Sequence, residues 1–485
     1  MNWIQQQPWF IYLFPSLAYL IGVKDYAAFT NTTDLIFQIL IFTIVTLLLY
    51  FIAKKISKKN VRFILLLFYT LIVYTFFGNI KLNLAKSVPF LAHYPSLLIL
   101  LGALFVILYF LFRNQKIRKF VFSYSNMLVL VLLVFQLGQF IYAKASQSDP
   151  IINPTPTKAF SDKPNLYFVL FDGYPGFEAL DSLFTYDNTQ HKIALEQRGY
   201  HVIDSIRSNY NYTLAAMSSL FNINYVDREQ SMPVSDFSFM YKARKAINYS
   251  TIAQAFQEEN YKINNLSIFP FANQKGVADY IGYLTPLQIA NKYFFHNYLL
   301  NDLAKNDKYK YLPIVSLYEK PLDRYYYQNK RIFTDCIASI NPSEPTFTYA
   351  HLLLPHEPYL TDSAGNLWKD LSAIPEQEAF LQYTKYASKL MLDLADAIEQ
   401  KDSNAAVLFL SDHGYRGLTG EDKKYSYHNF LALKTPDNKY DQIENVKSNI
   451  HVFPYLLNNY YGQDIEYKKD STFYIFYTKN VFETL

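Results

Sequence analysis

The sequence places six consecutive apolar residues before an acid and an imidazole in the stretch Ala405-Ala-Val-Leu-Phe-Leu-Ser-Asp-His-Gly414. Such an uninterrupted run predicts a strand that is buried on both faces, as in a parallel sheet. Ligands bind at the carboxyl ends of such strands, and Asp412 and His413 stand at this one. Together they offer an oxygen and a nitrogen ligand to a divalent cation. In the plainer interpretation, Asp412 caps a following helix and His413 packs nearby.

Composition limits the class of protein. A chain of 485 residues is long enough for two or three domains. The net charge of +4 is too small for the concentrated basic face of a nucleic-acid-binding protein, so no nucleic-acid partner is expected. The single cysteine, Cys336, excludes an intrachain disulfide. Nearly all long uncharged runs lie before Lys144, so the N-terminal third differs in class from the rest.

The first third predicts an integral membrane protein. A helix that spans a bilayer needs roughly 20 apolar residues. We therefore predict an N-terminal five-helix transmembrane bundle within residues 1–145, with spans near 8–23, 35–53, 63–80, 95–112 and 120–143. Arg, Lys, Asp and Glu are absent from the interiors of these spans, which indicates an anchor rather than an ion pathway. Asn126 and Gln136 are interpreted as helix–helix hydrogen-bonding residues.

Two of the short connections between spans are strongly basic. The second and third spans are joined through Lys54, Lys55, Lys58, Lys59 and Arg62, and the fourth and fifth through Arg113, Lys116, Arg118 and Lys119. The positive-inside rule places both connections in the cytoplasm. With five spans, the N-terminus is then cytoplasmic and everything after Ala143 is outside the membrane.

The remainder predicts a connector and one α/β domain. Residues 146–164 contain four prolines, which favours a semi-extended linker. Residues 165–485 alternate short apolar runs with longer mixed segments, which predicts a mostly parallel central sheet flanked by helices. Predicted strands are 165–171, 200–203, 262–268, 347–354, 405–410 and 430–433, and predicted helices include 193–198, 250–259 and 379–399.

The first predicted strand ends in the same way as the stretch at Asp412. It runs directly into Asp172-Gly173. A single Asp-Gly pair usually marks a turn. Because two strands end with an acid followed closely by glycine, we favour two carboxylates that converge on one cation.

Thr213 follows a polar, aromatic loop and precedes residues of helix-forming composition. It is therefore predicted as the N-cap of a helix. A helix N-terminus also presents free N–H groups to an anion. A hydroxyl at that position, beside a metal, can attack phosphorus.

Four of the nine histidines fall at predicted strand ends: His351, His356, His413 and His428. A shared site explains this grouping better than random scatter. Together with Asp172, Asp412 and Thr213, they supply the residues of a metal-dependent catalytic site.

These residues resemble the alkaline phosphatase/sulfatase superfamily, and above all its membrane-anchored branch of lipoteichoic acid synthases and phosphoethanolamine transferases. The most specific motifs are Ser411-Asp412-His413-Gly414 and Pro355-His356-Glu357-Pro358-Tyr359. The layout covers the whole chain and the motifs cover residues 165–436. The resemblance implies a sulfatase-like catalytic domain over residues 165–485, outside the inner (plasma) membrane of a bacterium.

The resemblance also implies a role for each site residue. Asp172, Asp412 and His413 would hold the metal, with Thr213 as nucleophile and fourth contact. His356 and His428 would bind phosphoryl oxygens or a second metal, or protonate the leaving group. His351, Arg416 and Asn429 are predicted as substrate contacts, the last two without a firm motif match. The alternatives are that His351 only supports the end of the sheet and that Arg416 forms an exposed salt bridge. The mixed ligand set suits one or two Zn²⁺ or Mn²⁺ ions.

The implied reaction is transfer of a phosphoryl-linked group, of phosphoglycerol or phosphoethanolamine type, from a membrane lipid to an envelope glycan or lipid. It would pass through a phospho-threonine at Thr213. The alternatives are a phosphodiesterase, phosphatase or other sulfatase-like hydrolase, and a catalytically inactive membrane-anchored binding protein. Cys336 lacks the Pro and Arg of the formylglycine motif, which disfavours sulfate-ester cleavage by that route. Asp172 stands where lipoteichoic acid synthases have Glu, so the resemblance does not carry over a particular substrate.

Overall fold

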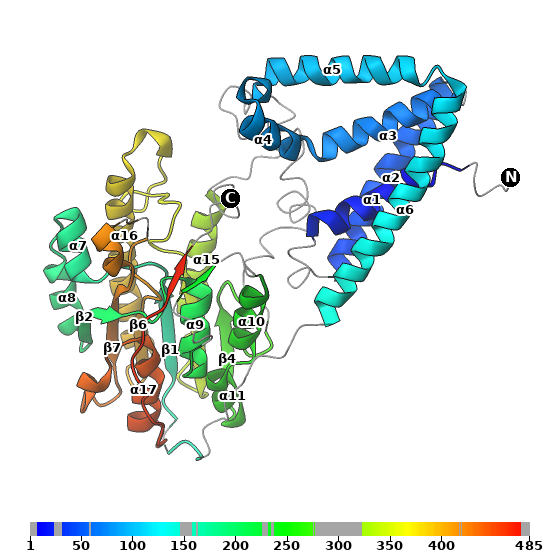
Figure 1. The fold of residues 1–485 in the computed structure, drawn as a ribbon. Helices are drawn as coiled ribbons and strands as arrows, with labels where there is room; N and C mark the ends of the chain where they lie inside the picture. The colour runs from blue at the N-terminus through cyan, green and yellow to red at the C-terminus, as the bar shows by residue number, and fades with distance from the viewer. Residues whose placement is uncertain are drawn as a thin grey trace. The chain divides into compact units, whose positions relative to one another are not determined.

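The computed structural model describes residues 7–23, 32–57, 60–145, 158–161, 163–225, 231–233, 237–274, 276, 323–416, 418 and 420–476. These residues form an N-terminal helical unit and a C-terminal α/β unit, with the boundary after Gln147 (Figure 1). Most of the predicted connector, residues 146–164, lies outside the described residues.

The helical unit consists of apolar helices in sequence order. They are α1 (Trp9–Val23), α2 (Thr32–Ile56), α3 (Val61–Thr75), α4 (Phe77–Ser87), the 3₁₀ helix η3 (Pro89–Ala92), α5 (Tyr94–Leu111) and α6 (Gln115–Ala145). The long apolar helices confirm a membrane protein.

The predicted number of five spans is too high for the described residues. Three helices there are long and apolar enough to cross a membrane: α2 from Leu35, α5 and α6. The predicted span 63–80 breaks at Phe76, where α3 and α4 meet at 67°, and the pair adds a fourth span only if it counts as one. At 1.5 Å per residue, the 15 residues of α1 extend about 22 Å, short of the roughly 30 Å of a bilayer core. Apolar composition alone does not reveal the break at Phe76.

Helix α1 packs within the helical unit. Phe10 and Ile11 are fully buried against residues of α2, α3 and α6. Asn126 of α6 accepts a hydrogen bond from the Phe10 N–H at 3.0 Å and donates one to the Gln7 carbonyl at 2.9 Å. The amide thus pairs backbone groups at the start of α1, and Asn126 acts as the predicted helix–helix hydrogen-bonding residue.

The α/β unit is built on a six-stranded sheet in the order β2-β7-β6-β1-β5-β4. Its strands are β1 (Leu166–Phe171), β2 (His201–Arg207), β4 (Lys262–Leu266), β5 (Thr346–Leu352), β6 (Ala406–Leu410) and β7 (His428–Lys434). Each predicted strand corresponds to one of these. β7 is antiparallel to β2 and β6, and the other pairings are parallel. The predicted mostly parallel sheet is confirmed. A separate parallel pair joins β3 (Ser231–Pro233) to β8 (Tyr474–Phe476).

Helices cover both faces of the sheet. They are α7 (Phe177–Phe184), α8 (Thr189–Glu196), α9 (Thr213–Asn222), α10 (Phe237–Asn248), α11 (Thr251–Glu258), α15 (Asp323–Ala338), α16 (Glu376–Lys401) and α17 (Val452–Tyr460). Four short 3₁₀ helices add to them: η6 (Leu371–Ala373), η7 (Gly420–Ser426), η8 (Ile443–Asn445) and η9 (Asn449–His451).

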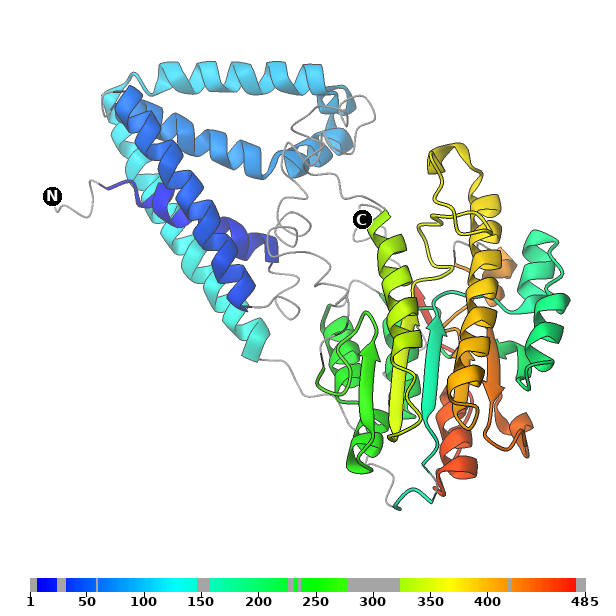
Figure 2. The same ribbon diagram turned by 180° about the vertical axis from the view of Figure 1, so that it is seen from behind.

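Strand β1 shows how the two faces differ. Tyr167 and Val169 belong to the core cluster that includes Met391 of α16 and Ile332 of α15. Phe168 points the other way and contacts Phe221 of α9, with ring centroids 5.8 Å apart. Alternation along the strand therefore buries both faces, as expected for a central strand. Figure 2 shows α15 and α16 in front of the strands, whereas α9 lies in front in Figure 1.

One edge of the sheet collects the predicted site residues. The carboxyl ends of β1, β5 and β6 meet there, because these strands are parallel neighbours. The antiparallel β7 brings its first residue, His428, to the same edge.

Candidate metal centre

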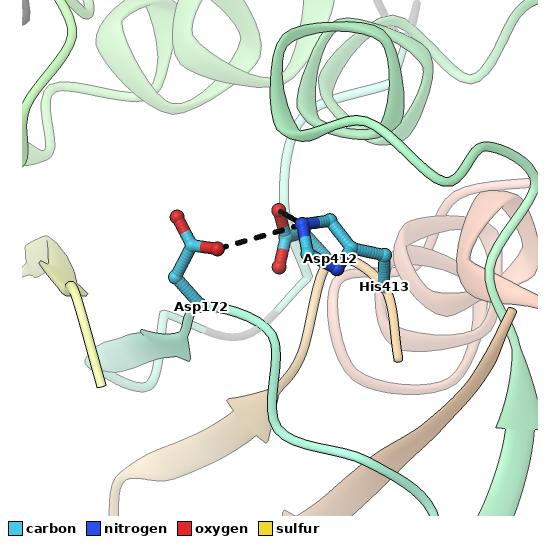
Figure 3. Close-up of side chains that lie close together, drawn as sticks. All are labelled: Asp172, Asp412 and His413. Carbon is cyan, nitrogen blue, oxygen red and sulfur yellow. Dashed lines mark ion pairs between the residues drawn. The ribbon is translucent and has the colours of Figure 1, made fainter. Parts of the chain in front are cut away.

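Three side chains converge at this edge: Asp172 after β1, and Asp412 and His413 after β6 (Figure 3). One ligand atom from each lies within 4.8 Å of the others, and all three residues are buried. Because β1 and β6 are hydrogen-bonded neighbours, residues 240 positions apart in the chain become adjacent.

The two oxygens of Asp172 have different surroundings. Oδ2 lies 3.0 Å from His351 Nε2 on β5. Oδ1 is buried with no hydrogen-bond partner among the described residues and lies 3.6 Å from His413 Nε2.

The two oxygens of Asp412 also differ in their surroundings. Its Oδ1 accepts a hydrogen bond from the Gly173 N–H at 3.0 Å. Its Oδ2 has no hydrogen-bond partner in the described part of the chain and lies 3.4 Å from His413 Nε2. Gly173 has a φ of +74°, a backbone conformation that glycine adopts without strain, so the turn after β1 supplies the N–H that orients the second carboxylate.

His413 presents its Nε2 atom to the carboxylates of Asp172 and Asp412. Nδ1 lies 2.7 Å from the Gly414 carbonyl oxygen and must donate to it, which leaves Nε2 with a lone pair. A Cβ on Gly414 would lie 2.1 Å from the Tyr425 carbonyl oxygen, so this close approach of chain segments requires glycine.

The three atoms left over fit a divalent metal. Asp172 Oδ1, Asp412 Oδ2 and His413 Nε2 are electron-rich, and hydrogen bonds on the opposite atom of each group aim them at one another. Buried polar atoms without partners are rare and call for an explanation. Two oxygens and one imidazole nitrogen form a ligand set that zinc and similar ions accept.

Electrostatics at the cluster agree with this fit. Burial and the charge of Asp172 raise the pKa of Asp412 above its usual value. Burial would also raise the pKa of Asp172, but interactions with His356, His351 and His413 outweigh it and lower that pKa. Burial, reinforced by the charge of Arg416, lowers the pKa of His413 to about 3, so its imidazole is neutral at physiological pH.

Thr213 lies beside the cluster at the start of α9. Its Oγ1 is 3.4 Å from His413 Nε2. The prediction that Thr213 is the N-cap is wrong by one residue: Tyr212 holds that position with an extended backbone, and α9 begins at Thr213. The Thr213 hydroxyl is therefore directed at the cluster.

His356 and Arg416 form a pair near the cluster. Arg416 Nη2 donates a hydrogen bond to His356 Nε2, and His356 Nδ1 donates one to the Glu357 carbonyl at 2.6 Å. A Cβ on Gly173 would lie 4.0 Å from the Cα of His356, which places the loop after β5 against the turn after β1. Both side chains are partly exposed.

His428 has a partner that the sequence did not indicate. Its Nδ1 lies 3.5 Å from Glu178 Oε2, in the first turn of α7. The Gly176 N–H also donates to the His428 carbonyl at 2.9 Å, so the start of α7 is joined to the start of β7. Glu178 carries no local signal beyond being an acid in a first helical turn. Burial lowers the pKa of His428, and Glu178 opposes that effect.

The other two predicted substrate contacts, His351 and Asn429, are both fully buried. Asn429 donates to the Ser411 carbonyl and, at 3.1 Å, to Asn449 Oδ1. His351 pairs with Asp172. The structure gives both residues positions that support the cluster.

The solved structures that are similar to this chain have low identity. The periplasmic domain of EptC from Escherichia coli is 14% identical with a TM-score of 0.39, and the match covers 67% of this chain and 93% of that one. The periplasmic domain of phosphoethanolamine transferase EptC from Campylobacter jejuni is 13% identical with a TM-score of 0.35, and the match covers 64% of this chain and 92% of that one. The integral membrane lipooligosaccharide phosphoethanolamine transferase A from Neisseria meningitidis is 13% identical with a TM-score of 0.37, and the match covers 90% of this chain and 94% of that one.

No curated protein matches the chain in sequence. A family model does, and its description is Sulfatase. The match covers residues 180–459, which include α9, the β5 and β6 strand ends and the start of β7. Since these residues make up more than half of the 485, the chain belongs to the sulfatase family of enzymes.

Proposed function

We propose that this enzyme transfers a phosphoryl-linked group from a membrane lipid to an envelope glycan or lipid, through a phospho-threonine at Thr213. One observation carries the proposal: Thr213 Oγ1 lies 3.4 Å from His413 Nε2, beside two carboxylates that each have one oxygen without a hydrogen-bond partner among the described residues. A hydroxyl next to a metal-ligand set is the arrangement of an activated nucleophile.

The metal ligands in this proposal are Asp172 Oδ1, Asp412 Oδ2 and His413 Nε2, with Thr213 Oγ1 as a fourth contact. A bound Zn²⁺ or Mn²⁺ supplies positive charge that lowers the pKa of the hydroxyl and offsets charge on the transferring group.

The residues of the chain account for the remaining steps. The N–H groups of the first turn of α9 bind a phosphoryl oxygen and orient the group for attack. The Thr213 hydroxyl gives up its proton to water as a bond forms from Thr213 Oγ1 to phosphorus, and the bond from phosphorus to the lipid oxygen breaks. The leaving oxygen takes a proton from His428, because both ring nitrogens of His356 are engaged by Arg416 and the Glu357 carbonyl. The acceptor hydroxyl then attacks phosphorus and gives its proton to His428, and the bond from phosphorus to Thr213 Oγ1 breaks.

Arg416 and His356 are suited to the charge that builds up on the equatorial oxygens. Their hydrogen bond brings a guanidinium next to the imidazole. A guanidinium binds phosphoryl oxygens through paired N–H donors.

Cys336 supports a threonine nucleophile over a modified cysteine. It is fully buried in α15, within the core cluster that packs on the sheet. Burial raises the pKa of its thiol to about 12. A buried, protonated thiol is chemically inert.

The membrane helices support a lipid donor, because they keep the α/β unit tethered to a bilayer. The proposed location is the bacterial inner membrane, with the α/β unit on the extracytoplasmic side.

The experiment follows the head group of a labelled phospholipid incubated with the purified full-length protein, an envelope extract and Zn²⁺. We expect label on a glycan or lipid acceptor, and loss of the reaction in EDTA. Label released only as a free phosphorylated head group would overturn transfer in favour of hydrolysis by the same residues. No turnover of the lipid with any added metal ion would favour an inactive binding protein.

A further inference from the structure

His351 and Tyr349 stand next to each other on one face of β5, since alternate residues of a strand point the same way. Both side chains are fully buried. The parallel register pairs His351 with Leu170, and Asp172 leaves β1 two residues later. The imidazole therefore lies beside the strand end from which the first candidate metal ligand projects.

The hydrogen bonds between these residues have one consistent direction. His351 Nε2 lies 3.0 Å from Asp172 Oδ2, and a carboxylate only accepts, so Nε2 carries the proton. His351 Nδ1 then has a lone pair and accepts from the Tyr349 hydroxyl at 3.2 Å. Burial, with the charges of Asp412 and Asp172, raises the pKa of Tyr349 well above its usual value, so the hydroxyl keeps its proton.

Aromatic packing holds the side chains of Tyr349 and His351 in place. The Tyr349 ring stacks on Phe168 with centroids 5.3 Å apart and contacts Phe221 at 5.0 Å. The His351 ring meets Phe269 at 5.6 Å. Neither side chain has room to turn without disturbing its neighbours in a close-packed core.

The hydrogen bonds from Tyr349 to His351 and from His351 to Asp172 determine which oxygen of Asp172 is available to a metal ion. His351 occupies Oδ2, and Oδ1 is left buried, without a partner in the described ranges, 3.6 Å from His413 Nε2. If the carboxylate were free to rotate, either oxygen or both would face the cluster. Fixing it in advance removes that freedom before a cation binds.

We propose that Tyr349 and His351 are positioning residues that hold Asp172 as a one-oxygen ligand and thereby set the affinity of the site for a divalent cation. The proposal rests on the proposed function, since it concerns the same metal site. In this proposal His351 orients the metal ligand Asp172 and does not contact the substrate.

The test measures Zn²⁺ affinity of the purified full-length protein by competition with a chromophoric chelator, without substrate. Tyr349→Phe removes one hydroxyl and keeps the packed ring. His351 Nδ1 then loses its donor, and the imidazole no longer has a fixed tautomer. We expect affinity to fall about 10-fold, the lower end of the range for partners behind metal ligands.

Tyr167→Phe is the matched control. Tyr167 is also a fully buried tyrosine, on the adjacent β1, and its hydroxyl donates to Asp402 Oδ2 at 3.0 Å. We expect its Zn²⁺ affinity to equal that of the wild type. At His351, the Gln variant keeps an N–H donor and is expected to bind Zn²⁺ more tightly than the Leu variant.

Wild-type affinity in Tyr349→Phe, or an equal loss in Tyr167→Phe, would overturn the proposal. Neither result concerns the nucleophile. The proposed function fails separately, if Thr213→Ala keeps full turnover of the lipid donor.

Discussion

Thr213 Oγ1 and His413 Nε2 lie 3.4 Å apart although 200 positions separate the two residues in the chain. One is the first residue of α9, and the other follows the central strand β6. Their contact joins a hydroxyl at a helix N-terminus to a candidate metal ligand. The predictions below depend on this arrangement.

Thr213→Ala is expected to lower turnover of a phospholipid donor by about 10³-fold or more, as removal of a nucleophile does in other enzymes. The fold should survive, because the cap position of α9 belongs to Tyr212. Thr213→Ser keeps a hydroxyl and should retain measurable activity. Ser218→Ala is the control on the same helix, and its buried hydroxyl lies more than a turn further along. Rates are measured by release of the labelled head group. Equal rates in Thr213→Ala and Ser218→Ala would remove Thr213 from the mechanism.

Asp412→Asn is expected to stabilise the metal-free protein at neutral pH by about 1–3 kcal/mol. Burial and Asp172 raise the pKa of Asp412, so its ionised form is unfavourable in the folded state. That cost is absent below the pKa of the unfolded state, near 3.8, and is fully present above the raised pKa of the folded state. The gain should therefore shrink as pH falls.

Thermal unfolding in EDTA measures this effect, and the rise in midpoint that Zn²⁺ gives the wild type should disappear in Asp412→Asn. Asp402→Asn is the contrast. Asp402 is also a buried carboxylate, but its Oδ2 accepts from Asn165 and Tyr167, so the Asn variant should be less stable. Destabilisation by Asp412→Asn in EDTA would show that this carboxylate is structural.

His356→Ala and Arg416→Ala should reduce turnover non-additively, because Arg416 donates directly to His356. Once His356 is absent, the loss from Arg416→Ala should be smaller than it is in the wild type. The comparison pair is His428→Ala with Arg416→Ala. His428 lies next to Glu178, and its effect should add to that of Arg416. A double-mutant cycle on the rate constants measures both couplings. Full additivity for His356 and Arg416 would mean that the two residues act independently.

A reporter fused to the C-terminus should be active only on the extracytoplasmic side of the membrane. The positive-inside rule predicts this orientation from the basic connections around Lys54 and Arg113. A matched fusion within the Arg113–Lys119 connection should report from the cytoplasm. The reverse pattern would contradict the proposed side of the membrane and the envelope substrates together.

Strands β1 and β6 could be predicted from sequence because each is a short apolar run, whereas β2 and β4 mix apolar with polar residues. Strands such as β1 and β6 are buried on both faces, so every position must be apolar. The same property marked the candidate ligands, since Asp172 and Asp412 are the first acids after such runs. Because parallel neighbouring strands end at the same edge of the sheet, the strand prediction alone was enough to expect Asp172 and Asp412 to lie close together.

The contacts between distant segments could not be predicted. Glu178 reaches His428 from the first turn of α7, a position that hydropathy and periodicity do not single out. The bend at Phe76 lies within a segment that is apolar enough to count as one span, and hydropathy does not report where a helix changes direction. Helix α9 begins at Thr213, one residue before its predicted start, because Tyr212 has the extended backbone of an N-cap; the Thr213 side chain lies beside His413.

The most direct test of the account is a search for a covalent intermediate at Thr213. The full-length protein is incubated with a phospholipid donor and Zn²⁺ but without acceptor, quenched in acid and digested for mass spectrometry. We predict that the peptide containing Thr213 gains the mass of the transferred phosphoryl-linked group, and that the same peptide of Thr213→Ala does not. Turnover of the donor with this peptide unmodified, or with the group on another residue, would contradict it.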